Sequence, residues 1–120
     1  MAGLPKQVRL LNKADYNTVF SKSVKISNSL FLILIHKTSN PQTRLGLVIS
    51  KKVDKRAVQR NRIKRIIRES FRNTDFETSC DYVVLAKPKI SSLANKEIFE
   101  SLTQLWNQAQ SKIKQSRKNQ

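Results

Sequence analysis

The architecture of this protein is set by one segment, residues 45–72, which reads LGLVISKKVDKRAVQRNRIKRIIRESFR. Its first part, 45–49, is apolar apart from one glycine, which is typical of a strand. From residue 56 to residue 72 the apolar side chains recur at helical spacing, and this predicts an amphipathic helix. The apolar arc of that helix consists of Ile63, Ile66, Ile67 and Phe71. A strand that leads into such a helix indicates a fold in which helices pack against a sheet.

The predicted helix and the loop before it carry a dense block of positive charge. Residues 51–72 hold ten basic and two acidic side chains, hence a net charge of +8. One face of the helix is polar and consists of Asn61, Arg65, Arg68 and Arg72, with Lys64 beside them. Guanidinium groups pair with phosphate oxygens in a two-pronged geometry, so a rigid row of them favours nucleic acid as the partner. The alternative is a solvated helix face, although only Glu69 offers compensating charge within the helix.

The whole chain shares this imbalance of charge. Its 120 residues include 24 Lys and Arg but only 8 Asp and Glu, hence a formal net charge of +16 and a pI of about 10.6. So strong a positive charge on a small domain points to a polyanionic partner, with nucleic acid first and an anionic membrane surface second. The length fits one domain, 1–120, and the apolar content of 38% allows a packed core, which we expect at about residues 8–113.

Composition excludes several classes of protein and of site. A single Cys rules out a disulfide framework and a Cys-rich zinc module, and a single His rules out any site that needs two. No apolar run approaches the ~20 residues that span a bilayer, and the first residues lack the apolar region of a signal peptide. We therefore expect a cytoplasmic protein with no membrane partner.

Further elements are predicted upstream of the basic segment. Asn12 is a typical helix cap, and a short amphipathic helix is expected to follow it over 13–21. Residues 23–27 alternate as in a weak strand, and the continuous apolar run 30–35 indicates a strand covered on both faces. We expect strands 30–35 and 45–49 to pair as an antiparallel hairpin with a longer loop.

Two more elements are predicted downstream. A strand over 81–86 is followed by a final helix, which Ser91 or Ser92 is expected to cap and whose apolar side chains recur at helical spacing. The polar tail, 114–120, is expected to fray. The predicted order is therefore α-β-β-β-α-β-α, which gives an α+β two-layer sandwich.

The basic segment and its neighbours also match a known family. The stretches that carry the match are Leu45–Val53, Ala57–Arg65 and Arg68–Arg72, with Arg60-Asn61-Arg62 at their centre. They closely resemble the protein subunit of bacterial ribonuclease P, whose signature is that triplet. The resemblance extends from about Val8 to about Lys112 and includes the pairs Asp15-Tyr16 and Leu105-Trp106.

This resemblance implies both a fold and an activity. It implies the same order of elements, with a left-handed β-α-β crossover around the basic helix, against the usual right-handed rule. It implies a ribonucleoprotein endonuclease that removes the 5′ leader of precursor tRNA. In this family the RNA subunit supplies the active site and binds the Mg²⁺ ions. The resemblance therefore implies no catalytic residue in the protein and no metal held by the protein alone. No obligate protein partner is evident from the sequence.

The acidic residues of the sequence agree with that division of roles. Eight scattered carboxylates and one His offer no paired-carboxylate or His-based nuclease site. Asp75, Glu77 and Asp81 lie two and four residues apart and could suggest a metal site, but they flank the start of a predicted strand.

Two sets of site residues follow from the resemblance. The signature helix and the loop before it are expected to contact the catalytic RNA through Lys51, Lys52, Arg56, Arg60, Asn61, Arg62, Lys64, Arg65, Arg68 and Arg72. The 5′ leader is expected in a cleft between the first helix and the sheet, with Arg60 near its edge and a lining of Tyr16, Phe20, Phe31, Leu32 and Leu34. Single-stranded bases stack on rings without a sequence code, which suits an enzyme with many substrates. The alternative for Tyr16 and Phe20 is simple core packing.

This chain departs from its relatives at two of these places. Asp54 stands where relatives often carry glycine, so the resemblance does not imply the conformation of the loop before the basic helix. Leu34 stands where some relatives carry an aromatic residue, which predicts weaker stacking in the cleft.

Two other functions also fit the charge. A ribosomal or ribosome-assembly protein would share the charge and the fold but would need no aromatic cleft. A sequence-neutral DNA-binding protein often shows a basic β-arm or a wedge residue, and neither is evident here. The nucleic acid that co-purifies with the protein distinguishes the three: a single catalytic RNA, ribosomal RNA, or DNA.

Overall fold

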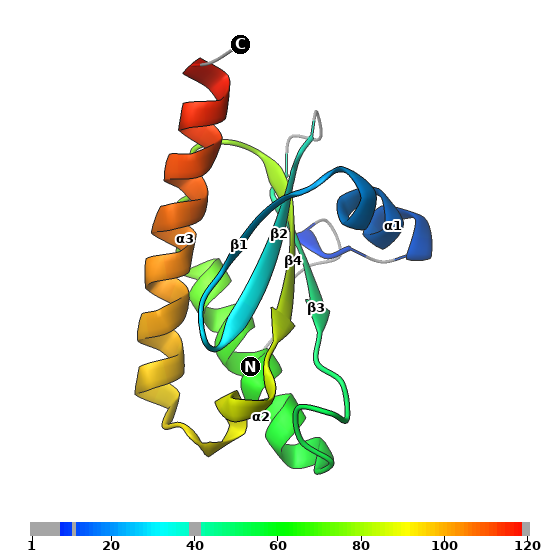
Figure 1. Cartoon of the computed structure of the whole chain (residues 1–120), viewed down its shortest axis with the longest axis vertical. Helices are drawn as coiled ribbons and strands as arrows, with labels where there is room; N and C mark the ends of the chain where they lie inside the picture. The colour runs from blue at the N-terminus through cyan, green and yellow to red at the C-terminus, as the bar shows by residue number, and fades with distance from the viewer. Residues whose placement is uncertain (1–7, 11, 39–41, 119–120) are drawn as a thin grey trace.

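The computed structural model describes residues 8–10, 12–38 and 42–118 (Figure 1). Its elements follow the chain in the order α1 (Lys13–Lys22), β1 (Val24–Ser27), β2 (Phe31–Lys37), β3 (Arg44–Val48), α2 (Ala57–Arg72), β4 (Cys80–Ala86), η2 (Pro88–Ser92) and α3 (Asn95–Lys118). A four-stranded sheet has α2 and α3 against one face and the short α1 against the other (Figure 1). The predicted α+β sandwich and the order α-β-β-β-α-β-α are confirmed, with one short 3₁₀ turn, η2, in addition.

The strands lie in the order β1-β2-β4-β3, so the last strand of the chain lies inside the sheet, between β2 and β3 (Figure 1). β2 pairs with β4 antiparallel, with Phe31 opposite Ala86, and β3 pairs with β4 in parallel, with Leu45 opposite Tyr82. The expected hairpin of strands 30–35 and 45–49 is therefore wrong. β4 takes the inner position because its apolar side chains are buried on both faces, whereas the shorter β3 contains a glycine and lies at the edge.

The basic helix connects two parallel strands. β3 leads into α2, and α2 leads into β4, which lies beside β3 in the sheet. This is the β-α-β crossover that the family resemblance implies. Its left-handed sense stays a prediction of the resemblance.

Two apolar clusters hold the layers together, one on each face of the sheet. The larger lies beneath α2 and α3 and includes Phe31 of β2 and Tyr82 of β4. Trp106 of α3 packs edge-on against Tyr82, with the two ring centroids 5.5 Å apart. The Nε1 of Trp106 donates a hydrogen bond to the hydroxyl of Ser70 at 2.8 Å. The smaller cluster lies beneath α1 and consists of Leu10, Val19, Leu34 and Val83. The prediction that the apolar run of β2 is covered on both faces is thus confirmed.

The C-terminal helix begins later than expected and extends into the polar tail. Pro88–Ser92 forms the 3₁₀ turn, so neither Ser91 nor Ser92 caps α3, which begins at Asn95. A proline at the start of this turn fixes its own φ and favours such a tight turn. At the other end α3 continues to Lys118, and the fraying expected of residues 114–120 stays a prediction. Lys, Gln and Arg are good helix formers, which allows the polar end to continue the helix. The last two residues of the chain lie outside the described part.

Candidate nucleic-acid interface

α2 presents one apolar face and one polar face, as its sequence predicts. Ile63 and Ile67 are fully buried against the sheet, so the helix is firmly anchored. The opposite side and the turn before the helix carry the polar set. Its exposed or partly exposed members are Lys51, Lys52, Asn61, Lys64, Arg65, Arg68 and Arg72, here called the basic face. An anchored helix holds these groups at fixed spacing, which suits recognition of a folded polyanion.

Arg60, the first arginine of the signature triplet, turns toward the protein. Its Nη1 donates to the main-chain oxygens of Asp54 and Lys55, at 2.9 and 2.8 Å. These two bonds fasten the loop that precedes α2 onto the first turns of the helix. Arg60 therefore fixes the loop beside the basic face.

Arg62, the other arginine of the triplet, joins α2 to the segment that leads into α3. Its Nη2 donates to the main-chain oxygen of Ser91 at 2.9 Å, and its Nη1 donates to the main-chain oxygen of Leu93 at 3.3 Å. Asn95 Oδ1 and Gln59 Oε1 accept further bonds from the same guanidinium. Most donors of Arg62 are thus used within the protein.

Asp54 accepts three hydrogen bonds from Arg56. Its Oδ1 accepts from the main-chain N–H and from Nε of Arg56, at 2.8 and 3.1 Å, and its Oδ2 accepts from Nη2 at 2.9 Å. These bonds hold the pKa of the Asp54 carboxyl well below its ordinary value of 3.8. The side chain of Arg56 is 68% exposed. The exposed guanidinium of Arg56 is therefore already paired with a carboxylate of its own chain.

A cleft of about 240 Å³ opens between α1, the edge of β3 and α2. Its lining combines one ring, three leucines and three cations: Tyr16, Leu10, Leu45, Leu47, Arg9, Lys64 and Arg68. The cleft joins the first helix to the basic face, since Lys64 and Arg68 belong to both. A ring, an aliphatic wall and positive charge are together what a single nucleic acid strand requires.

Four of the lining residues are absent from the set expected from the sequence, namely Arg9, Leu10, Leu45 and Leu47. Arg9 reaches the cleft because its backbone lies beside Leu45, and the Leu10 N–H donates to the Leu45 carbonyl at 3.0 Å. Residues 8–10 show no strand pattern, so this pairing leaves no signal in the sequence. Leu45 and Leu47 do have a sequence signal: they alternate along a strand, which places both side chains on the same side of it.

Tyr16 is held in the cleft by β3. Its phenol oxygen accepts a hydrogen bond from the main-chain N–H of Leu47 at 3.3 Å, and its ring covers Gly46. Phe20 lies one turn further along α1, with its ring centroid 6.5 Å from that of Tyr16 and the planes 31° apart. Phe20 is 44% exposed. The two rings therefore form an open aromatic surface, and core packing does not account for Phe20.

The three cleft residues predicted on β2 divide between the two faces of the sheet. Phe31 is fully buried beneath α2 and α3, so the prediction that it lines the cleft beside α1 is wrong. Side chains alternate along a strand, and a continuous apolar run does not reveal which set faces which helix. Leu34 is buried beneath α1 and supports that helix, while Leu32 is partly exposed on the same face.

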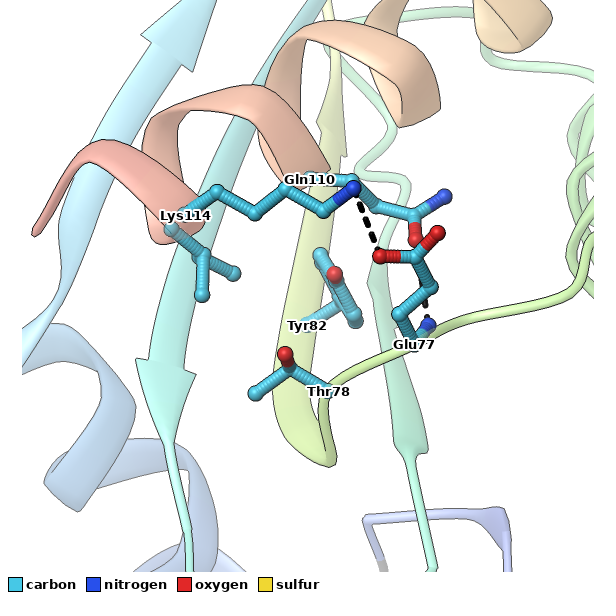
Figure 2. Close-up of a pocket in the computed structure, with 6 residues that line it drawn as sticks. Glu77, Thr78, Tyr82, Gln110 and Lys114 are labelled. Atoms are coloured by element: carbon cyan, nitrogen blue, oxygen red, sulfur yellow. Dashed lines mark hydrogen bonds and ion pairs between the residues drawn. The ribbon is translucent and has the colours of Figure 1, made fainter. Parts of the chain in front are cut away.

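A second, narrower pocket lies between α3 and the segment that precedes β4. Figure 2 shows Lys114 reaching across to Glu77, with Tyr82 and Thr78 beside them. The ammonium and the carboxylate lie 2.6 Å apart, and the Glu77 N–H donates to Gln110 Oε1 at 3.1 Å. The pocket has no room for a water-sized molecule. These contacts therefore tie α3 to the segment before β4 and form no ligand site.

Two of the three acids that could suggest a metal site are paired with different cations, and the third, Asp75, is exposed. Glu77 pairs with Lys114, while Asp81 accepts hydrogen bonds from Nε and Nη2 of Arg44, at 2.8 and 2.7 Å. Within residues 8–10, 12–38 and 42–118, no group of three His, Cys, Asp or Glu side chains is placed to hold a metal ion. Among the helices of that same part of the chain, none has the length and apolar character that a bilayer crossing requires.

Comparisons with known proteins find similar sequences and similar folds. Residues 4–110 match the family model described as Ribonuclease P. The ribonuclease P protein component of Marinomonas sp. (strain MWYL1) is 48% identical over 106 residues, which cover 87% of this chain and 80% of that protein.

Several solved structures share the fold. One is the RNase P protein of Staphylococcus aureus, in a mutant form with defective mRNA degradation activity. It aligns with a TM-score of 0.81 at 29% identity, over 87% of this chain and 89% of that one. The RNase P protein from Thermotoga maritima aligns with a TM-score of 0.75 at 28% identity, over 83% of this chain and 96% of that one.

Proposed function

Because the chain belongs to the ribonuclease P protein family, we propose that it is the protein subunit of a ribonuclease P ribonucleoprotein in the cytoplasm. Its partner is the catalytic RNA. Its substrate is precursor tRNA, whose 5′ leader the particle removes by hydrolysing one phosphodiester bond. One observation carries the proposal: Lys64 and Arg68 belong both to the basic face of α2 and to the cleft that contains Tyr16.

The basic face of α2 is the surface that we assign to the catalytic RNA. Asn61 and Arg65 are exposed there, while the opposite side of the helix is buried in the core. Phosphate contacts of this kind release counterions, so binding to the RNA is expected to weaken steeply with salt. Arg60 and Arg62 support this surface by fixing the loop before α2 and the segment before α3.

The cleft is the site that we assign to the 5′ leader. Tyr16 and Phe20 offer rings on which bases can stack, and Leu32 extends the apolar surface. Lys64 and Arg68 offer charge to the phosphates of the same strand. Neither kind of contact reads base identity, so one cleft can serve many precursor tRNAs.

We assign the chemical step to the RNA and its Mg²⁺ ions. A general base or a metal ligand needs a carboxylate that can turn to the substrate. In this chain Asp54 is bonded to Arg56, Asp81 to Arg44 and Glu77 to Lys114, which leaves these carboxylates committed to the protein's own cations. Phosphate oxygens of a folded RNA supply the hard ligands that Mg²⁺ prefers.

Reconstitution with a bacterial ribonuclease P RNA and a precursor tRNA tests the proposal. We expect cleavage at the mature 5′ end by the complex, no cleavage by the protein alone, and tighter binding of leader-bearing than of leaderless tRNA by the complex. The protein purified from cells should bring down one RNA species. Cleavage by RNA-free protein would contradict the assignment of the chemistry. Recovery of ribosomal RNA in its place would favour the ribosomal alternative.

A further inference from the structure

α1 carries Tyr16, which lines the cleft, and Phe20, whose ring lies beside that of Tyr16, but the helix buries few of its side chains against the sheet. Of its ten residues, all of which the structure describes, Val19 alone is buried. A helix of this length is not stable in water by itself. Polar contacts with the strands beneath it must therefore help decide where α1 lies.

Arg44 of β3 supplies such a contact. Its Nε and Nη2 donate to the two carboxylate oxygens of Asp81 on β4, at 2.8 and 2.7 Å. Its Nη1 lies 3.6 Å from Oδ2 of Asp15, in the first turn of α1. The side chains of Arg44 and Asp81 are only 20% and 5% exposed. The buried two-pronged pair fixes the guanidinium in one orientation, with its remaining amino group directed at α1.

The ion pair lies next to the ring that it would control, because Asp15 immediately precedes Tyr16. Arg44 and Gly46 alternate along β3 and so face the same side of the sheet, toward α1. Arg44 meets the carboxylate of Asp15, and Gly46 receives the ring of Tyr16. The start of the helix is fixed separately, by the bond from the Asp15 N–H to Asn12 Oδ1 at 2.9 Å.

We propose that Arg44 is a positioning residue for the 5′ leader: through Asp15 it sets where α1 holds Tyr16 and Phe20 beside the cleft. The inference rests on the proposed function, since it concerns the same cleft. Arg44 does not touch the leader. Without its contact α1 can shift on the sheet, and the rings then lose their alignment with Lys64 and Arg68, which stay fixed on α2.

Asp15→Asn tests this with the least damage to the fold, because Asp81 keeps its partner. The measurement is equilibrium binding of the reconstituted holoenzyme to precursor tRNA and to the same tRNA without its leader. We expect about a two- to five-fold loss for the leader-bearing tRNA, the range of a partly exposed ion pair. Binding of leaderless tRNA and of the catalytic RNA should stay at the wild-type level.

Three variants serve as controls. Asp75→Asn changes the net charge by the same amount at an exposed site after α2 and should change neither tRNA affinity. Asp15→Glu keeps the carboxylate and should restore the preference for the leader. Arg44→Lys keeps a cation beside Asp81 but lacks the planar group that serves two acids, so it should repeat the loss seen with Asp15→Asn. Thermal unfolding of each variant separates a general loss of stability from a loss confined to the leader.

Two results would overturn the inference, and only the second of them would also contradict the proposed leader cleft. If the wild-type holoenzyme prefers leader-bearing tRNA and Asp15→Asn behaves like Asp75→Asn, then Arg44 has no positioning role and the proposed function stands. If the wild-type holoenzyme binds both tRNAs equally, the leader cleft itself is wrong and the role of Arg44 fails with it.

Discussion

The ring of Tyr16 lies so close over Gly46 that a β-carbon at position 46 would be 2.7 Å from Cε1 of the ring. The φ angle of Gly46 is not positive, so glycine is needed here for space and not for backbone conformation. The next residue of β3, Leu47, donates its N–H to the phenol oxygen of the same ring. β3 therefore contacts the Tyr16 ring in two ways: Gly46 lies under the face of the ring, and Leu47 binds the phenol oxygen at its end.

Gly46→Ala should displace this ring and destabilise the fold. Forcing a methyl group into a filled space typically costs about 1–3 kcal/mol, which urea unfolding can measure. Tyr16→Ala removes the ring and with it the clash, so Gly46→Ala should cost much less in that background. An equal cost in both backgrounds would show that the ring does not cover Gly46.

The two faces of α2 could be predicted because burial imposes a period on the sequence. Ile63 and Ile67 recur one turn apart, and the structure buries both. The partner of β3 could not be predicted in this way. Main-chain hydrogen bonds are alike for all strands, and an apolar run shows that a strand is buried but not which strand lies beside it. Only the structure shows that β4 separates β2 from β3.

For the same reason, the placement of some residues of the candidate site could be predicted from the sequence and that of others could not. The exposure of Asn61 and Arg65 follows from the helical period, whereas the face of Phe31 does not follow from an unbroken apolar run. The inward direction of Arg60 and Arg62 is set by carbonyl groups of the loop before α2 and of the segment before α3. Residue type gives the charge of a side chain, but the nearest acceptor depends on the tertiary fold.

Arg65→Ala and Arg62→Ala should therefore have opposite signatures. Arg65 is exposed on the basic face, so its loss should leave stability nearly unchanged and lower the log–log salt slope of binding to the catalytic RNA by about one unit. Arg62→Ala should leave the main-chain oxygens of Ser91 and Leu93 without this donor and destabilise the fold by about 1–3 kcal/mol. Chemical unfolding and salt titrations of RNA binding measure both. A reduced slope with unchanged stability for Arg62→Ala would assign that arginine to the RNA.

Asp54→Asn should strengthen binding to the catalytic RNA. The variant keeps the Oδ1 atom that accepts from the Arg56 N–H but removes the charge that competes with phosphate for the guanidinium. Asp75→Asn provides the matched control, since it changes the net charge equally at an exposed site away from Arg56. Equilibrium binding at several salt concentrations should show a larger gain for Asp54→Asn. Equal gains would mean that only net charge matters.

The Asp54–Arg56 pair should also give stability a particular dependence on pH. The bonds from Arg56 lower the pKa of Asp54 in the folded state, so the folded protein favours the charged carboxylate. This contribution is present above the unfolded value of 3.8 and is lost as the pH falls toward the lower folded value. The stability difference between the wild type and Asp54→Asn should therefore shrink as the pH drops below about 4. Urea unfolding at a series of pH values measures it, and a constant difference would exclude a role for the ionised carboxylate.

Tyr16→Ala should weaken binding of leader-bearing precursor tRNA to the holoenzyme while mature tRNA binds as before. A lost base stack is worth about 1–3 kcal/mol, which sets the upper limit of the effect. Because the ring also packs on Gly46, the thermal midpoint of the variant must be measured beside its affinity. Tyr16→Phe is the matched control: it keeps the ring and loses only the bond from the Leu47 N–H, so it should retain most of the leader binding. Phe20→Ala should repeat the loss with little change in stability, since Phe20 is 44% exposed. If Tyr16→Ala penalises mature and precursor tRNA equally, the ring serves packing alone and the leader lies elsewhere on the protein.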